Sequence, residues 1–378
     1  MKIAQVAPLY ERVPPMSYGG TERIVSYLTE ELIRQGHEVT LFASGDSLTK
    51  ARLVAACERA LRLCPDYLDC MPHNFLQLEQ VFQRAASFDI IHFHIDFLHF
   101  PFSRRMDIAH VTTLHGRLDI PDLVSLYHEF TDMPVISISN AQRTPLSWIN
   151  WQGTVYHGLP LDLYELKADR GSYLAFLGRI SPEKRVDRAI EIAKAVNMKI
   201  KIAAKIDEVD RDYVEREIRH LLDHPLVEFV GEIGDEEKSE FLGNAYALLF
   251  PIDWCEPFGL VMIEAMACGT PVVAYRQGSV PEVIDNGVTG FVVESIEEAI
   301  RALKQIDHLD RKRCREIFEE RFSVERMTRD YIKIYEKLIA TKARRSIKAI
   351  KQKRIATAVK SDFAEADIHA LGSDAEKD

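Results

Sequence analysis

Short apolar runs of strand length alternate with helical patterns along almost the whole chain of 378 residues. The runs rich in β-branched and aromatic residues cover 2–9, 38–44, 89–95, 110–116, 135–139 and 154–158, and then 173–180, 199–205, 227–233, 247–253, 271–275 and 290–294. Buried strands separated by helices are typical of parallel sheets with helices on both faces. The sequence therefore predicts an α/β fold with two successive Rossmann-like βα-repeated units.

A turn-rich segment near residues 160–172 separates the two series of strands. We predict an N-terminal domain over 1–165, a C-terminal domain over 166–325, a closing helix over 326–341, and a flexible tail over 342–378 that is first basic and then acidic. A chain of this length ordinarily forms more than one domain. A ligand shared by two such domains is expected between them, at the carboxyl ends of the strands.

The charge of the chain argues against nucleic acid as a partner, because 58 acidic residues face 48 basic ones. The first residues lack a secretory apolar core, and six scattered cysteines indicate reduced thiols, so we expect a cytoplasmic protein. Residues 342–360 carry Lys and Arg without any acid. That segment is either a solvated tail or a basic helix in weak contact with the inner membrane surface.

The segment E-P-F-G-L-V-M-I-E follows a predicted strand and carries two carboxylates, Glu256 and Glu264. Gly259 permits close backbone approach, and Leu260 opens an apolar helix whose N-terminus can face an anion. Glu264 falls about one turn into that helix. The two carboxylates could bind different hydroxylated parts of one phosphate-bearing ligand, although a helix-end carboxylate and a solvated one is the plainer alternative.

Two other segments place cations and glycines at the same predicted cleft. Arg179 and Lys184 lie in G-R-I-S-P-E-K, between a strand and a helix start, where the helix dipole disfavours cations. An anionic ligand would explain them, whereas ordinary surface charge would not need that position. Gly19 and Gly20 open the first helix and could form a backbone-amide pocket for phosphate.

Several other patterns support alternative functions less well. His92 and His94 share one face of a strand and could suggest a metal, but strand-end histidines are more often hydrogen-bonding groups. Asp210 and Asp212 match a metal-binding D-x-D pattern, but their surroundings indicate a helix start. A nucleotide-dependent oxidoreductase would need G-x-G-x-x-G after a strand, and this chain has none. We therefore expect no metal site.

Taken together, GGTER (19–23), GRISPEK (178–184) and EPFGLVMIEAMACGTPVVA (256–274) resemble glycosyltransferase family 4, also called glycosyl transferases group 1. The resemblance covers residues 1 to about 340. It implies a GT-B fold, with two Rossmann-like domains facing across a cleft and the helix over 326–341 crossing back to the first domain. It also implies transfer of a sugar from a nucleotide diphosphate donor to a hydroxyl acceptor, with retention of configuration and without a cofactor.

The resemblance assigns four residues to the reaction centre. Arg179 and Lys184 correspond to the pair that binds the donor's diphosphate and stabilises it as it leaves. Glu256 corresponds to the acid near the hydroxyls of the donor sugar, and His115 to the histidine that lies against the transferred sugar.

The resemblance also assigns residues that hold the donor and face the acceptor. The donor-binding residues are Gly19, Gly20, Phe258, Gly259, Leu260 and Glu264, the last of which would hold the ribose diol. Main chain near 205–206 and 231–233 would hold the base. Asn140 would lie at the acceptor-facing rim.

The expected mechanism is a front-face one in which the leaving phosphate oxygen accepts the proton of the acceptor hydroxyl, so that no strong protein base is needed. Two cations and helix N-termini would stabilise the leaving group. The expected donor is UDP-glucose. The acceptor stays open between a soluble saccharide, a small metabolite and a lipid-linked saccharide at the membrane, and a catalytically inactive sugar-nucleotide-binding protein is the remaining alternative.

Overall fold

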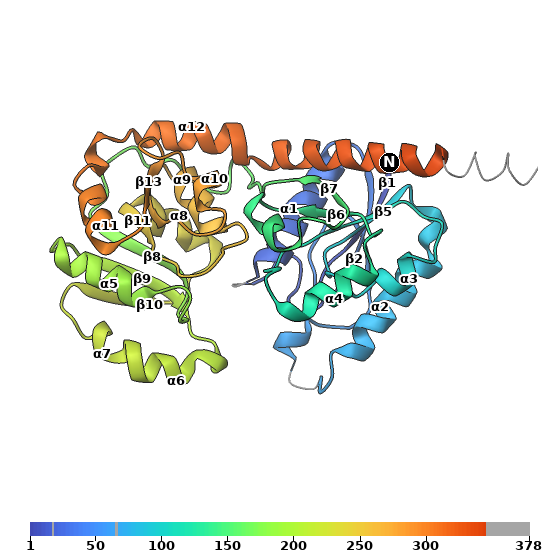
Figure 1. Ribbon diagram of the computed structural model, residues 1–378, viewed down its shortest axis with the longest axis horizontal. Helices are drawn as coiled ribbons and strands as arrows, with labels where there is room; N and C mark the ends of the chain where they lie inside the picture. The colour runs from blue at the N-terminus through green and yellow to red at the C-terminus, as the bar shows by residue number, and fades with distance from the viewer. Residues whose placement is uncertain (17–18, 65–66, 345–378) are drawn as a thin grey trace, which may run out of the picture.

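The computed structural model describes residues 1–16, 19–64 and 67–344, and it contains two α/β units side by side (Figure 1). Most of the segment 342–360, for which membrane contact is predicted, therefore lies outside the described residues. Within the described part, no helix combines the length and apolar character needed to cross a bilayer.

The first sheet has seven parallel strands in the order β3-β2-β1-β4-β5-β6-β7. They are β1 (Lys2–Val6), β2 (Glu38–Ala43), β3 (Arg52–Ala55), β4 (Ile90–Phe93), β5 (His110–Thr113), β6 (Val135–Ser137) and β7 (Trp151–Thr154). The strand order reverses at β1, which pairs with both β2 and β4. Such a reversal opens a crevice at the carboxyl ends of the two strands.

The second sheet repeats this plan with six parallel strands in the order β10-β9-β8-β11-β12-β13. They are β8 (Tyr173–Arg179), β9 (Ile200–Lys205), β10 (Val227–Gly231), β11 (Ala245–Phe250), β12 (Val272–Tyr275) and β13 (Gly290–Val293). The order reverses between β8 and β11. The second unit therefore has its own crevice for a ligand.

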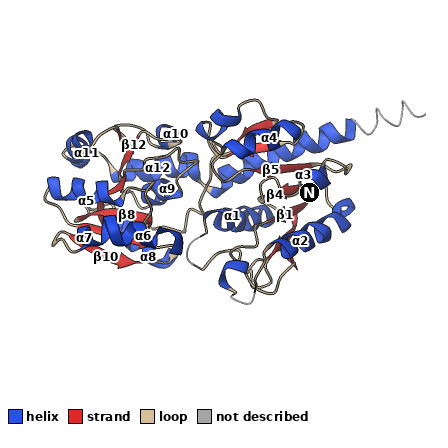
Figure 2. Cartoon of the chain, turned by 60° about the horizontal axis from the view of Figure 1, so that its bottom comes forward, coloured by secondary structure: helices blue, strands red, loops and turns tan. Residues whose placement is uncertain are grey.

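Helices cover both faces of the sheets, because successive strand residues point to opposite sides (Figure 2). In β1, Ile3 packs in the cluster of α1 (Gly20–Arg34), whereas Ala4 packs with Leu78 of α2 (Met71–Gln83). The second sheet lies likewise between α5 (Val186–Ala195) and α9 (Leu260–Ala267). The other α-helices that complete these layers are α3 (Phe100–Ser103), α4 (Pro121–Glu129), α6 (Arg211–Tyr213), α7 (Arg219–Leu222), α8 (Asp235–Gly243), α10 (Val280–Val283), α11 (Ile296–Leu303) and α12 (Arg311–Phe322).

One strand prediction was wrong, and one strand was not predicted. The run over 154–158 is not a strand, because β7 ends at Thr154 and the apolar residues beyond it pack between the domains. Tyr156, for example, lies against the rings of Phe258 and Phe322. The strand that was not predicted is β3, a short and half-exposed edge strand without a strong apolar pattern.

A helix over 324–344 follows α12 and lies along the first domain, which confirms the predicted crossing (Figure 1). Its Tyr331 and Tyr335 are fully buried, and Gln5 of β1 donates a hydrogen bond to the hydroxyl of Tyr335. The chain thus crosses between the domains twice. The two crossings touch where the amide of Leu159 donates to Phe322 O and that of Val324 donates to Leu159 O.

The contact between the crossings leaves no space for a side chain at Gly158. A Cβ atom there would lie 2.3 Å from the carbonyl oxygen of Ser323. We expect Gly158→Ala to lower the free energy of unfolding by about 2 kcal/mol, as overpacking against rigid backbone does, measured as a lower urea midpoint. Gly116→Ala is the matched control, because a Cβ there meets nothing within 4 Å. Equal midpoints for the two variants would contradict this account of the crossing.

Candidate active site between the two domains

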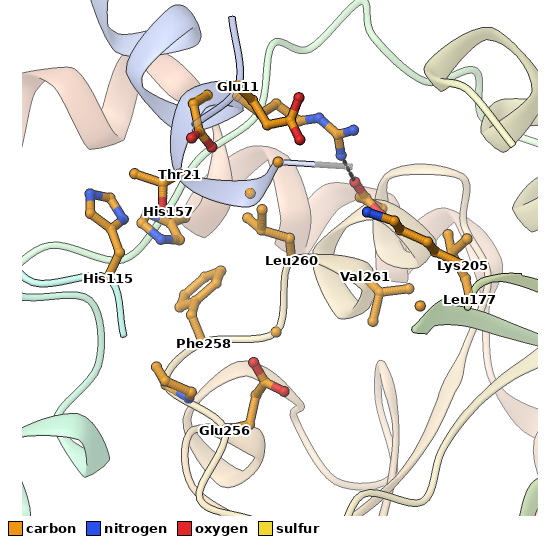
Figure 3. Close-up of a pocket in the computed structure, with 18 of the residues that line it drawn as sticks. Glu11, Thr21, His115, His157, Leu177, Lys205, Glu256, Phe258, Leu260 and Val261 are labelled. Carbon is orange, nitrogen blue, oxygen red and sulfur yellow. Dashed lines mark hydrogen bonds and ion pairs between the residues drawn. The ribbon is translucent and has the colours of Figure 1, made fainter. Parts of the chain in front are cut away.

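A cavity of about 480 Å³ lies between the two domains, at the carboxyl ends of strands from both sheets (Figure 3). His115 follows β5 and Ile138 follows β6 on one side, and Gly178, Lys205 and Phe250 end β8, β9 and β11 on the other. Both crevices therefore open into one space. This is the position that the sequence predicts for a shared ligand.

The N-termini of α1 and α9 lie close to each other at the wall of this cavity. A Cβ added to Gly20, the first residue of α1, would lie 3.5 Å from the Cδ1 atom of Leu260, the first residue of α9. Neither helix has a side-chain cap. Apart from the backbone N–H of Glu22, which donates to its own carboxylate, their leading N–H groups beside Gly19 and Gly259 could face an anion.

The loop before α9 brings its backbone close to the cavity. Gly259 has a φ of 78°, and a Cβ there would lie 2.8 Å from the Cε atom of Met262. Phe258 lines the cavity while its ring packs against His157 at 4.9 Å. The predicted residues of this motif thus form one wall of the cavity.

Glu256 lines the cavity and is held through one oxygen only. Its Oε2 accepts a hydrogen bond of 2.5 Å from Lys184 Nζ and one of 3.1 Å from Trp254 Nε1. Its Oε1 has no partner among the described residues and is not one of their buried unpaired atoms. The carboxylate is therefore oriented by Lys184 and Trp254, and it presents its second oxygen to the cavity.

The ammonium of Lys184 has an aromatic backing. It lies 4.9 Å from the ring centroid of Trp254 and 5.5 Å from that of Phe250. Lys184 precedes α5 by two residues and lies in a turn before Arg185. Cation–π contact and the Glu256 carboxylate together hold this cation at the cavity wall.

Glu264, like Glu256, is held through only one of its two carboxylate oxygens. Its Oε1 accepts from Arg23 Nη1 at 2.9 Å and from the Tyr164 hydroxyl at 3.2 Å, and Lys238 Nζ lies 3.5 Å away. Its Oε2 has no hydrogen bond in the described part of the chain and is not one of the buried unpaired atoms. This oxygen is the one available to a ligand in the cavity.

Arg23 and Lys238 were not assigned to the site by the sequence analysis. Arg23 lies in the first turn of α1 and forms ion pairs with Glu264 and with Asp235 Oδ1 at 3.0 Å. Burial alone would lower the pKa of Arg23, but those two carboxylates raise it above its usual value. A cation close to a helix start, the signal that singled out Lys184, also marks Arg23.

The structure places Arg179 outside the cavity wall of the described residues. Its guanidinium pairs with Glu183 at 2.6 Å and with Asp207 and Asp210 at 3.4 Å each. Asp210, the first acid of the D-x-D pattern, thus serves as a partner of an arginine. Three carboxylates of the protein therefore pair with this guanidinium.

Asn140 likewise lies outside the cavity wall of the described residues. Its backbone amide and that of Ala141 donate to the carboxylate of Glu282 at 2.8 and 2.6 Å. Its side-chain amide donates to the Tyr156 hydroxyl at 3.2 Å. Asn140 therefore contributes to contact between the domains.

His115 and His157 lie at one end of the cavity with their rings stacked 5.4 Å apart (Figure 3). Burial lowers the pKa of His115 to about 3, so its imidazole is neutral. Its Nε2 is 2.9 Å from Nδ1 of His94, whose pKa burial also lowers. His115 thus offers a neutral polar ring to the cavity.

Two other site predictions concern the base and a metal. Lys205 lines the far end of the cavity with Glu232 and Ile233, within the two neighbourhoods predicted for the base. Across the ranges 1–16, 19–64 and 67–344, no group of three or more His, Cys, Asp or Glu side chains could hold a metal ion. His92 and His94 instead take part in hydrogen bonds with protein groups.

Two family models match the chain. The model described as glycosyltransferase family 4 matches residues 18–151, and the model described as glycosyl transferases group 1 matches residues 165–321. An uncharacterized glycosyltransferase of Methanocaldococcus jannaschii is 26% identical over 277 residues, which are 67% of this chain and 77% of that protein. A 41.2 kDa protein of the Klebsiella pneumoniae cps region is 28% identical over 170 residues, which cover 43% of this chain and 46% of that protein.

A solved structure shares the fold. Anabaena HepE in complex with UDP-glucose superimposes with a TM-score of 0.66 at 18% sequence identity, covering 90% of this chain and 99% of that one. The two parallel sheets, the cleft between them and the returning helix are those of a GT-B fold. With a model matching each of its two domains, the chain belongs to the group 1 glycosyltransferases of glycosyltransferase family 4.

Proposed function

We propose that this glycosyltransferase moves glucose from UDP-glucose to a hydroxyl acceptor with retention of anomeric configuration and without a metal. The proposal is based on two carboxylates, Glu256 and Glu264, each of which is held through one oxygen only. They lie on either side of the N-termini of α1 and α9, which have no side-chain cap. Carboxylate oxygens suit hydroxyl groups, and helix N-termini suit phosphates. The complex of Anabaena HepE supports UDP-glucose as the donor.

In this proposal the donor lies along the cavity from His115 to Lys205. The diphosphate sits between the N-termini of α1 and α9, beside Lys184. Glu264 Oε2 accepts hydrogen bonds from the ribose diol, and Glu256 Oε1 accepts one from the sugar. The base lies near Lys205, and the acceptor enters from the first domain.

The chemistry follows from the charge that develops on the leaving group. When the bond between the anomeric carbon and the phosphate oxygen breaks, negative charge builds up on the diphosphate, and Lys184 and the helix N–H groups stabilise it. The same phosphate oxygen takes the proton of the acceptor hydroxyl. Glu256 serves to position the sugar, because its Oε2 is already held by Lys184 and Trp254. Arg179 joins Lys184 by exchanging its carboxylate partners for the diphosphate.

Loss of the Lys184 cation should slow transfer. We expect Lys184→Ala to lower kcat by about 100-fold, the usual effect of removing one charge-stabilising group. Release of UDP from UDP-glucose is measured with a library of acceptors, and proton NMR of the product gives its anomeric configuration. Lys194→Ala, an exposed lysine on α5, is the matched control. If the protein binds the donor but does not turn it over, it is a catalytically inactive binding protein. Loss of turnover on addition of EDTA would contradict transfer without a metal.

Recognition of the ribose by Glu264 makes a separate prediction. The wild-type protein should bind UDP about tenfold more tightly than 2′-deoxy-UDP, as expected for one hydrogen bond to a charged group, and Glu264→Gln should lose most of that preference. Isothermal titration calorimetry measures both affinities. Glu256→Gln, at the sugar end of the cavity, should keep the preference. The same loss in both variants would contradict the assignment of Glu264 to the ribose.

Glu22 makes the binding of an intact sugar nucleotide depend on pH. It lines the cavity at the start of α1, and a Cβ added to Gly19 would lie 3.2 Å from its Oε2. Burial raises the pKa of Glu22 to about 7. Below that pH the neutral carboxyl can donate a hydrogen bond to a phosphate, and above it the carboxylate repels the diphosphate.

We therefore expect the Kd of UDP-glucose to rise about tenfold between pH 6 and pH 8, equivalent to one pKa unit of coupling. Glu22→Gln, which stays neutral, should flatten this profile. Titration calorimetry at each pH checks both proteins. A flat wild-type profile, or an unchanged profile in the variant, would show that Glu22 does not face the diphosphate.

A further inference from the structure

A continuous series of buried hydrogen bonds connects the cavity to the C-terminal helix. In order it joins His115, His94, Gln5, Tyr335, His92, Thr113 and Tyr331. The first three of these contacts measure 2.9, 2.8 and 3.2 Å. His115 is mostly buried and every other member is fully buried, so water competes little for these groups. The series begins at the proposed sugar site and ends on the helix over 324–344.

The amide of Gln5 sets the direction of the donors. Its Nε2 donates to the Tyr335 hydroxyl, so its Oε1 is an acceptor and the His94 Nε2 that it meets must carry a proton. His94 is neutral because burial lowers its pKa well below the usual value. A neutral imidazole carries one proton, so Nδ1 of His94 is an acceptor, and His115 Nε2 donates to it.

The far half of the series agrees with this direction. Thr113 donates to the Tyr331 hydroxyl, so it accepts from Nε2 of His92. Nδ1 of His92 is then an acceptor for the hydroxyl proton of Tyr335. Tyr335 therefore donates to His92 and accepts from Gln5, and every member donates in the same sense along the series.

The consequence at the cavity is a single tautomer of His115. With its proton on Nε2, its Nδ1 has a free lone pair. Nδ1 has no hydrogen bond among the described residues and is not one of their buried unpaired atoms, and His115 lines the cavity. His115 thus presents an acceptor, rather than a donor, to whatever occupies this end of the cavity.

We propose that Gln5 and Tyr335 are positioning residues that hold His115 in the Nε2–H tautomer, so that its Nδ1 accepts a hydrogen bond from a hydroxyl of the transferred sugar. This inference rests on the proposed function, which places the sugar beside His115. It gives the returning helix a part in the reaction, because the hydroxyl that completes the series comes from that helix. Without the Tyr335 hydroxyl, Gln5 loses its acceptor and can rotate, and both tautomers of His94 and His115 become accessible.

The decisive measurement is the tautomer of His115 in the free protein, by NMR of ¹⁵N-labelled histidine rings. Protonated and unprotonated ring nitrogens have different shifts, and His115→Asn identifies the signals by their loss. The wild-type spectrum should show His115 protonated at Nε2 only. Tyr335→Phe and Gln5→Leu should show a mixture of tautomers. Gln5→Glu should restore the wild-type pattern, because either form of its carboxyl accepts from His94 Nε2.

Kinetics supply the second readout. In Tyr335→Phe and Gln5→Leu, kcat/KM for UDP-glucose should fall about tenfold, as for loss of one hydrogen bond. The Kd of UDP should stay within about twofold, since UDP carries no sugar. Tyr127→Phe is the matched control, because it removes a buried hydroxyl of the same domain that lies outside the series. Its kinetics and His115 signals should be those of the wild type.

The two readouts separate this inference from the proposed function. A wild-type His115 protonated at Nδ1, or a single Nε2–H tautomer that survives in Tyr335→Phe, would overturn the inference even if glucose transfer is normal. Failure to turn over UDP-glucose would overturn the proposed donor, while the NMR result would still decide the tautomer. A fall in kcat/KM in Tyr127→Phe equal to that in Tyr335→Phe would assign the effect to packing and contradict the positioning role.

Discussion

The buried ion pair between Arg23 and Glu264 is the interaction on which the active site depends. It joins α1 of the first domain to α9 of the second, and Asp235 completes it from α8. Because removing one partner leaves a buried charge uncompensated, breaking such a pair typically costs about 3–5 kcal/mol. The pair holds the two uncapped helix N-termini close to each other. The cavity is thus lined by residues of both domains around this ion pair.

Several charged groups of the site are paired before any ligand binds. Lys184 is paired with Glu256, and Arg23 and Lys238 share Glu264 and Asp235. Glu256 and Glu264 are each held through one oxygen, which leaves the other for a ligand. Groups already oriented in this way need little rearrangement during the reaction. The neutral rings of His115 and His157 add polar groups without adding charge.

Much of this arrangement could be predicted from the sequence, because its parts lie in continuous segments. The alternation of strands and helices predicted both sheets, and Glu256, Glu264, Lys184 and the Gly19–Gly20 pair all reach one cavity. Arg179 and Asn140 lie outside the cavity wall, and Asn140 is held there by a distant segment. Glu282, which binds the backbone of Asn140, is 142 residues away in the sequence. No local pattern indicates such a partner.

The sequence by itself determined the fold class, the two-domain plan and the segments that carry the chemistry. These follow from periodicity and from glycines and charges at strand ends, which are properties of neighbouring residues. Only the tertiary structure decided that Arg23 meets Glu264 across 241 residues, and that Tyr335 and Gln5 orient His115 through His94. The physical reason is that hydrogen bonds and ion pairs of this kind depend on strand order and on the packing of one domain against the other.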